Sequence, residues 1–228
     1  MSSLSDIESP RFILRPLRVS DVDDVLAYQS NPDVVRFIPW PVRDASMVSE
    51  ALITAQHQST LARQGDYLNL AITHRDDGRV VGQVNAMYVS EQDQCAEIGY
   101  VVSPAYSRRG YALEATTALI SALFTTDKFR RVIATCDTRN VASLVVLERL
   151  GLRCEAHFRE DRLFKGEWIS TYVFAVLRHE WDNHVAHSTL NDGAHPRGTS
   201  LADATTSHFR ATLSPPAPRP RRPTWDAP

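Results

Sequence analysis

The sequence predicts an α+β fold built on a mixed, mostly antiparallel sheet. Between about 68 and 103, three strand-like runs are separated by turn signals, which is typical of an antiparallel meander. Across 94–137, a strand, a helix and a second strand follow one another, which indicates a parallel pairing with a crossover helix. The predicted order of elements is β-α-α-β-β-β-α-β-α-β-β.

The first predicted elements are a strand and a short helix. Residues 11–18 largely alternate apolar and basic side chains, which predicts a strand with one buried face. Ser20 and Asp23 have the spacing of a capping box, so we expect a helix to start there and run to about Ser30. It should stop at that point because Pro32 disfavours helical geometry in the residue before it.

A second helix is predicted from about 45 to 64, with Gly65 as its C-terminal stop. The stretch before it, 33–44, has neither a helical nor a strand-like period. It contains Phe37 and a tryptophan, Trp40, that stands between two prolines. Both aromatic side chains are candidates for the wall of a substrate site, and burial of the tryptophan in the core is an equally good alternative.

The meander occupies the middle of the chain. Its strands are predicted at 68–74, 79–89 and 94–103. The Asp-Gly pair that ends at Gly78 favours a tight hairpin turn. Gly82 lies inside the second strand, where a glycine indicates a bulge or the close approach of another backbone segment.

A short basic loop, 104–110, joins the meander to a helix predicted over 110–125. The first amide groups of a helix lack intrahelical acceptors, and the helix dipole gives them partial positive charge. Arg108 and Arg109 add two charges beside those amides, and Gly110 closes the turn. The loop is therefore a candidate phosphate-binding site. A solvated basic helix end is the simpler alternative.

The remaining elements of the domain are a strand, a helix and a hairpin. Residues 129–137 read as a short strand. Asn140 is a suitable N-cap for the next helix, which Gly151 can terminate. The final hairpin is predicted at 152–159 and 167–177.

Composition and charge exclude several classes of protein. The net charge of −2 gives no electrostatic footprint for nucleic acid. The 3 cysteines have no paired spacing, which favours a reducing compartment over a disulfide framework. No signal peptide or membrane-spanning run is visible. We expect a cytoplasmic protein with no membrane or nucleic-acid partner, and the sequence allows a homodimer.

The domain is expected to cover 10–182, after a flexible N-terminus at 1–9. From 183 to 228 the chain is rich in proline and polar residues and poor in aliphatic ones, which predicts a disordered tail. Within it, 215–223 has the composition of a polyproline ligand, although a solvated tail is the simpler interpretation.

Two stretches carry a resemblance to a known family. Residues 96–115, AEIGYVVSPAYSRRGYALEA, and 137–152, DTRNVASLVVLERLGL, resemble the acetyl-CoA site of the GNAT superfamily of acyltransferases. Within that superfamily the chain is similar to the RimJ/RimL-like ribosomal-protein N-terminal acetyltransferases. Similar outer features stand at 11–17, 81–83 and 166–181. The resemblance implies a GNAT fold in α/β/α layers, with a central βα unit that binds acyl-CoA.

The resemblance also implies how acetyl-CoA binds as co-substrate. The backbone of the third meander strand would hold the pantetheine arm, and the loop amides would hold the pyrophosphate. Ser107 stands where the family usually has glutamine or arginine, a departure that the neighbouring arginines can offset. The implied cofactor-binding residues are Val101, Val102, Ser107, Arg108, Arg109, Gly110, Tyr111, Ala112, Asn140 and Ser143.

The catalytic residues that the resemblance implies are Glu97 and Ser143. A strand glutamate often serves as the base in related enzymes, and apolar strand neighbours suit Glu97 to that task. An ordinary surface carboxylate is the alternative. Many relatives place a tyrosine acid where this chain has Leu147, so Ser143 or a water would assist the departing thiolate, or it would leave unaided.

The expected function is therefore acyl-CoA-dependent N-acylation of an amine, most simply acetylation of a protein N-terminus or a small-molecule amine. No metal-ligand spacing is present among the histidines and cysteines, so we expect no metal. Two alternatives remain open at this stage. One is a non-catalytic domain that binds acyl-CoA as a sensor, and the other is transfer of a larger acyl group such as succinyl.

Overall fold

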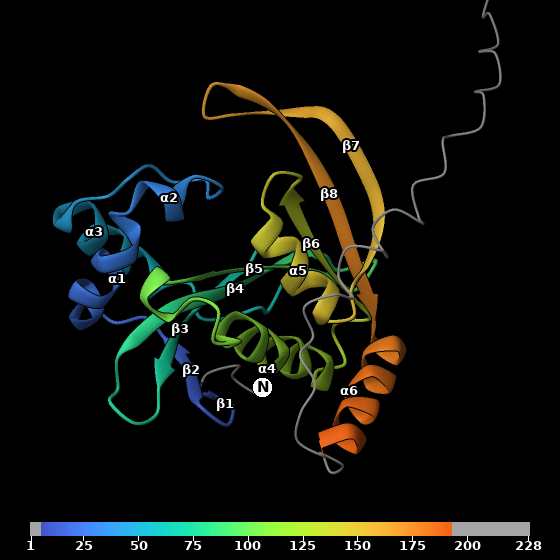
Figure 1. Cartoon of the computed structure of the whole chain (residues 1–228). Helices are drawn as coiled ribbons and strands as arrows, with labels where there is room; N and C mark the ends of the chain where they lie inside the picture. The colour runs from blue at the N-terminus through green and yellow to red at the C-terminus, as the bar shows by residue number, and fades with distance from the viewer. Residues whose placement is uncertain (1–5, 193–228) are drawn as a thin grey trace, which may run out of the picture. The chain divides into compact units, whose positions relative to one another are not determined.

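One sheet of 8 strands organises the computed structural model, which describes residues 6–192 (Figure 1). Its strand order is β1-β2-β3-β4-β5-β6-β8-β7. All neighbours are antiparallel except β5 and β6, as the sequence predicts. The strands are β1 (Ile7–Glu8), β2 (Phe12–Pro16), β3 (Tyr67–His74), β4 (Val80–Ser90), β5 (Cys95–Val102), β6 (Arg131–Asp137), β7 (Arg153–Phe164) and β8 (Glu167–Leu177).

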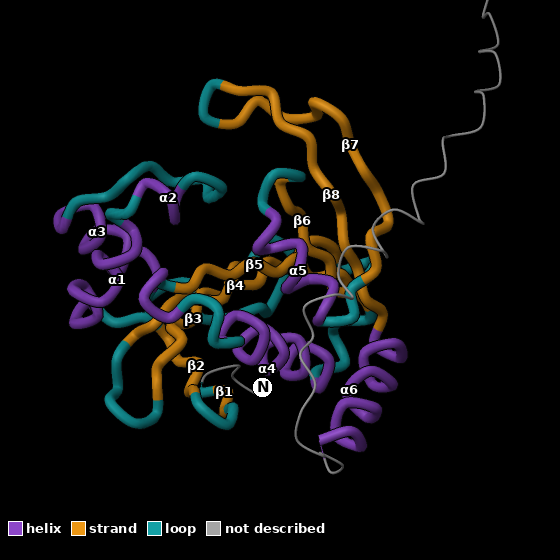
Figure 2. The backbone as a smooth tube through the Cα atoms, viewed as in Figure 1, coloured by secondary structure: helices purple, strands orange, loops and turns teal. Residues whose placement is uncertain are grey.

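Helices cover both faces of this sheet, so the predicted α/β/α layering is confirmed (Figures 1 and 2). The larger hydrophobic core lies between the sheet and α4, α5 and the start of α6. A smaller core lies on the other face, under α1 and α3. The α-helices are α1 (Val22–Gln29), α2 (Pro32–Val35), α3 (Ala45–Ala55), α4 (Tyr111–Thr125), α5 (Val141–Arg149) and α6 (Arg178–Asp192), with short 3-10 turns at Val19–Asp21 and Pro104–Tyr106.

The first helix begins differently from the prediction. The prediction of a capping box at Ser20 and Asp23 is wrong, because the carboxylate that caps the turn before α1 belongs to Asp21. It accepts a hydrogen bond from the amide of Arg18 at 2.8 Å. The same carboxylate forms a two-bonded ion pair with the guanidinium of Arg15, at 2.8 Å for each bond, and both side chains are buried.

Two further predictions about the N-terminal half are wrong. Residues 32–35 form a short helix, capped by the side chain of Asn31, where no regular structure was expected. The helix predicted to reach residue 64 ends at Ala55, so Gly65 is not its stop. After α3 the chain returns to the sheet, where the carbonyl of Gln58 accepts a hydrogen bond from the amide of Asn69 at 2.8 Å.

The close approach predicted at Gly82 is confirmed. A Cβ atom on this residue would lie 2.2 Å from the carbonyl oxygen of Val101 and 2.9 Å from the Cα of Val102. Glycine is therefore required for β4 to pack against the end of β5. The turn glycines Gly78 and Gly151 both have positive φ, of 70° and 75°, as expected of a hairpin turn and a helix C-terminus.

The C-terminal part of the domain is longer than predicted. The last hairpin begins at 153 and its two strands continue to a tight turn at Lys165 and Gly166. α6 extends to Asp192, so residues 183–192 are helical rather than part of a disordered tail. The rest of the predicted tail, 193–228, lies outside the described residues. No helix between residues 6 and 192 is long and apolar enough to cross a membrane.

Candidate functional site

The site begins where β5 and β6 separate. These parallel strands pair only from Cys95 to Glu97 on β5, opposite Arg131 to Ile133 on β6. Both strands continue beyond that point, β5 to Val102 and β6 to Asp137. β5 stays paired with β4 on its other side, where Val101 lies opposite Gln83. The edge of β5 that faces β6 is therefore left without a strand partner after Glu97.

The basic loop follows directly at the end of this open edge. Arg108 and Gly110 have positive φ values of 62° and 75°, so the chain curls tightly before α4 begins. The amide of Glu114 donates to the carbonyl of Gly110 at 3.0 Å, and this is the first hydrogen bond of α4. The amides of residues 111–113 precede it and therefore have no acceptor within the helix. Successive amides in such a curl form a concave anion site.

Tyr111 and Ala112, both predicted to bind the cofactor, are the first two residues of α4. The Tyr111 ring is buried, packs edge-on against Phe12 at 4.7 Å between ring centroids, and lies 5.9 Å from Tyr106. Burial of the ring fixes the start of α4, so its amides have a defined direction. The side chain of Arg109 leans over Tyr106, with 5.8 Å between the guanidinium carbon and the ring centroid.

Arg11 bonds to the basic loop and to the first turn of α4, a role that the sequence did not indicate. Its guanidinium donates to the carbonyl of Arg109 at 2.9 Å and forms an ion pair with Glu114 on the first turn of α4. The backbone amide of Arg11 donates to the same carboxylate at 2.8 Å. The contacts span about a hundred residues of sequence, and the only local signal was an arginine at the start of the first strand.

Glu97 lies at the closed end of the gap between the strands. Its carboxylate accepts a hydrogen bond from the hydroxyl of Thr135 on β6, at 2.6 Å. Burial, with the negative charge of Glu97 as a further cause, raises the pKa of Tyr67 to about 12. Thr135 therefore bonds to the predicted base and Tyr67 lies within reach of its charge, and neither residue was identified from the sequence.

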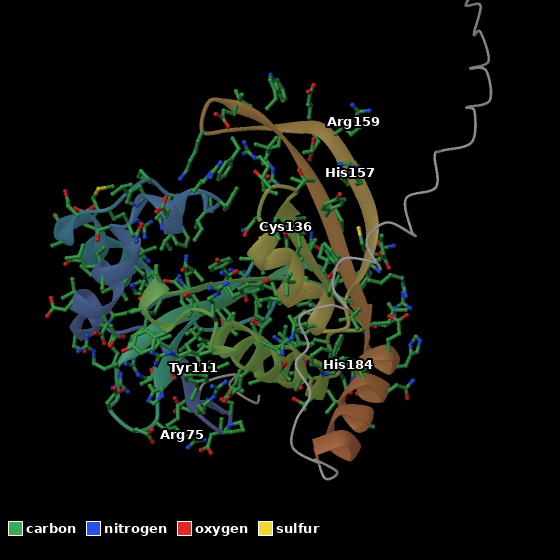
Figure 3. All side chains as sticks on the ribbon, viewed as in Figure 1. Arg75, Tyr111, Cys136, His157, Arg159 and His184 are labelled. Atoms are coloured by element: carbon green, nitrogen blue, oxygen red, sulfur yellow. The ribbon has the colours of Figure 1, made fainter. Side chains whose placement is uncertain are left out.

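Asn140 and Ser143 start α5 on the other face of the sheet. The side chain of Asn140 accepts a hydrogen bond from the amide of Ser143 at 3.2 Å, which confirms it as the N-cap. The hydroxyl of Ser143 lies 2.8 Å from the hydroxyl of Tyr100, a residue of β5. Cys136 is buried beside this turn (Figure 3), and burial raises the pKa of its thiol to about 11.

The tip of the β7–β8 hairpin approaches the 32–43 segment (Figure 2). Residues of both segments line a groove of about 610 Å³. The ammonium group of Lys165, at the tip, donates to the carbonyls of Val35 at 2.7 Å and Trp40 at 2.9 Å. The lining residues are Pro32, Val35, Arg36, Pro39, Pro41, Val42, Arg139, Phe164, Lys165 and Glu167.

The two predicted substrate-site aromatics lie beside this groove but do not line it. Arg36 stacks over the ring of Phe37 at 5.1 Å, and Arg43 over the ring of Trp40 at 4.9 Å. Trp40 packs against the smaller core, and its indole nitrogen is buried with no hydrogen-bond partner among the described residues. The Trp40 ring is therefore half-buried at the margin of the smaller core, and its role in binding substrate stays a prediction.

The groove is linked to Glu97 along β6. Thr135 and Asp137 are two residues apart on one face of this strand, a step of about 7 Å. Asp137 is bonded to Arg139, which also reaches Glu167 at 2.9 Å across the groove. Burial opposes ionisation of Asp137, but the hydrogen bonds from Arg139 outweigh this effect and lower the pKa of the carboxyl.

No group of three or more His, Cys, Asp or Glu side chains within 6–192 is placed to hold a metal ion. The 3 cysteines are free, with Cys95 and Cys136 buried and Cys154 exposed. The groups that this site brings together are the Glu97 carboxylate, the paired hydroxyls of Tyr100 and Ser143, and the basic loop before α4.

The chain is similar in sequence to known acetyltransferases. A family model described as an acetyltransferase (GNAT) domain matches residues 11–153. An uncharacterized N-acetyltransferase of Bacillus subtilis, YnaD, is 28% identical over 179 residues, covering 77% of this chain and 99% of that protein.

Solved structures show the same architecture. A GNAT-family acetyltransferase from Bacillus anthracis is 27% identical, with a TM-score of 0.67 over 76% of this chain and 98% of that chain. RimJ of Mycobacterium smegmatis, solved in complex with CoA-disulfide, is 24% identical, with a TM-score of 0.68 over 80% of this chain and 89% of that chain. At the latter identity, the likeness shows the fold alone.

Proposed function

The chain belongs to the GNAT family of acetyltransferases, and we propose that it transfers the acetyl group of acetyl-CoA to a primary amine. The amine is a protein N-terminus or a small molecule. The relatives are N-acetyltransferases, so the class of enzyme follows from the family. The donor and the acceptor are the proposed part.

The fit to CoA is supported by two features of the backbone. The open edge of β5, near Val101 and Val102, offers peptide groups that can bond to an extended pantetheine arm. The amides at the start of α4, with Arg108 and Arg109 on the same loop, suit a pyrophosphate. Because the edge leads into the loop, one extended ligand can contact both.

Glu97 is the proposed base. An amine is protonated in water and must lose a proton before it can attack a thioester. The hydrogen bond from Thr135 fixes the Glu97 carboxylate at the point where the strands separate, 2.6 Å from the hydroxyl. The carboxylate accepts the amine proton there, and the amine nitrogen attacks the acetyl carbon directly. Holding the two reactants together supplies much of the rate enhancement.

The proposal rests mainly on one observation: β5 and β6 stop pairing at Glu97 and Ile133, although both strands continue beyond these residues. It places the carboxylate at one end of an unpaired strand edge and the amide-rich loop at the other. A dinucleotide or nucleotide site needs the loop alone, whereas an acyl-CoA site also needs the edge.

The loop assignment is tested with two valine substitutions. Gly110→Val and Gly78→Val both place a β-branched residue at a positive φ, of 75° and 70°, so each should cost similar fold stability. Only Gly110→Val distorts the start of α4. We expect it to abolish CoA binding in titration calorimetry and Gly78→Val to preserve it. Equal affinities for the two variants would show that the loop is not the phosphate site.

The proposed chemistry is tested by thiol release with acetyl-CoA and a range of amines that includes N-terminal peptides. Glu97→Gln should lower turnover by about 100-fold, most strongly at lower pH, with CoA affinity unchanged. Succinyl-CoA as the donor tests the preference for the smaller acyl group. If the wild type binds CoA but acetylates none of the amines, the sensor alternative replaces the enzymatic one for this chain.

A further inference from the structure

A tyrosine reaches the start of α5 from an unexpected element. The family position for a tyrosine acid is occupied by Leu147, which is 1% exposed and packed in the larger core. The hydroxyl of Tyr100, on β5, instead lies 2.8 Å from the hydroxyl of Ser143 and 3.0 Å from its carbonyl oxygen. A contact across 43 positions of sequence thus supplies a phenol next to this serine.

The position of Tyr100 follows from the strand pattern. β5 alternates between the two cores, so Ile98 packs in the larger core and Val101 in the smaller one, while Tyr100 points to the larger core and α5. It also lies beyond Glu97, the last β5 residue that pairs with β6. Its ring therefore stands on the part of β5 that the proposed acyl-CoA site uses, on the face opposite Glu97.

We propose that Tyr100 is a positioning residue, which holds the Ser143 hydroxyl as a hydrogen-bond donor to the sulfur of CoA. The inference rests on the proposed function. When the C–S bond breaks, its electron pair goes to sulfur, which leaves as a thiolate. Ser143 donates a hydrogen bond to that thiolate, and Tyr100 donates one to the Ser143 oxygen. Neither residue gives up its proton, and the released thiolate takes one from solvent.

Tyr100 has one hydroxyl proton and two possible acceptors, both on Ser143. It bonds either the carbonyl or the hydroxyl oxygen of Ser143, and only the second choice frees the serine proton for sulfur. Burial raises the pKa of Tyr100 above its ordinary value, so the phenol keeps its proton and remains a donor. Cys136, the other titratable group beside Ser143, has a pKa raised to about 11 by burial and stays neutral.

The test measures the pKa of the CoA thiol when bound to the full chain. CoA carrying carbon-13 next to the sulfur reports thiolate formation by NMR during a pH titration. In the wild type, the bound thiol should have a lower pKa than free CoA. Tyr100→Phe should raise the bound value by about one unit, because one hydrogen bond to an anion is lost or misdirected. Tyr88→Phe, which removes the hydroxyl of a ring packed against Phe129 in the larger core, should not.

Two further variants, Ser143→Ala and Ser143→Ala combined with Tyr100→Phe, test whether Tyr100 acts through Ser143 or only supports the fold. Ser143→Ala should raise the pKa of the bound thiol at least as much as Tyr100→Phe. The double variant should match Ser143→Ala alone, since the tyrosine acts through the serine. Additive shifts, or an unchanged pKa in Tyr100→Phe with normal CoA affinity, would overturn the inference. Failure of the wild type to bind CoA would overturn the proposed function and this inference with it.

Discussion

Replacing Gly82 by alanine tests whether the packing of β4 against β5 sets the site. The new Cβ would lie 2.2 Å from the carbonyl oxygen of Val101, and real Cβ contacts almost never fall below 3.0 Å. The end of β5 must therefore move by about 0.8 Å, which is the difference between these distances. A backbone carbonyl in a paired strand has no rotamer through which to yield, so the strand itself shifts.

The energetic cost follows from that shift. Forcing an extra methyl group into a packed site costs about 1–3 kcal/mol. The amide of Ser103 donates to the carbonyl of Val81 at 2.8 Å, and loss of this bond adds about 1 kcal/mol. Since each kcal/mol shifts the Tm of a domain of this size by about 2–4 °C, Gly82→Ala should lower it by roughly 10 °C.

Gly99→Ala is the matched control, measured beside Gly82→Ala by thermal unfolding followed by circular dichroism. Its Cβ would also meet a close atom, 2.9 Å away, but that atom is the side-chain oxygen of Asn85, which can rotate away. Its Tm should change by no more than a few degrees, and CoA affinity should fall only in Gly82→Ala. Equal, small losses of Tm in both variants would refute the argument that the β5 backbone cannot move.

Three further predictions concern charged groups. Lys165→Met should speed amide hydrogen exchange in the β7–β8 turn by about tenfold, because two hydrogen bonds to backbone carbonyls are lost. Lys128→Met loses two similar hydrogen bonds, to the carbonyls of Leu61 and Ala62, and should leave exchange in that turn unchanged. Asp21→Ala should cost about 3–5 kcal/mol in urea unfolding by leaving Arg15 buried and unpaired, and replacing both residues by apolar ones should recover most of that loss. A hydrogen bond from Arg131 lowers the pKa of Glu155 below its ordinary value of 4.5. The ionised carboxylate therefore stabilises the fold above pH 4.5, and this contribution is lost as the pH falls below that value. In urea unfolding, the stability of Glu155→Gln should fall less steeply in acid than that of the wild type, and identical pH profiles would contradict this.

The sequence was most informative where a single residue fixes the local backbone. Gly78 and Gly151 mark a turn and a helix end through positive φ, and Asn140 caps α5, all as predicted. The same reasoning placed the strand, loop and helix around Gly110 correctly. The glycines adopt conformations that few other residues can adopt, and the cap needs a side-chain oxygen that few residues carry, so the local sequence is enough to specify these features.

The errors share a different cause. The helix predicted over 45–64 includes Leu61, which in the structure is buried in the larger core after the chain has left α3. Lys165 bonds to carbonyls 130 and 125 positions away, and no local pattern encodes such a contact. Helical period reports that a side chain is buried, and it does not report which surface buries it.

The same limit explains which parts of the candidate site could be predicted. Glu97 and Ser143 were identified by resemblance, whereas Thr135 and Tyr100, their hydrogen-bond partners, were not. Each partner lies on another element, and only the register of the sheet brings it within reach.

The alternation of side chains along β5 divides the proposed reaction between the two faces of the sheet. Glu97 is an odd-numbered position, as is Val101, which packs toward α1 and α3. Tyr100 is an even-numbered position and contacts α5. The amine would therefore lose its proton on one face while the thiolate departs toward the other, through the gap that opens beyond Glu97. Substitution of Glu97 should then alter the pH dependence of amine attack without moving the pKa of bound CoA, and substitution of Tyr100 should do the reverse.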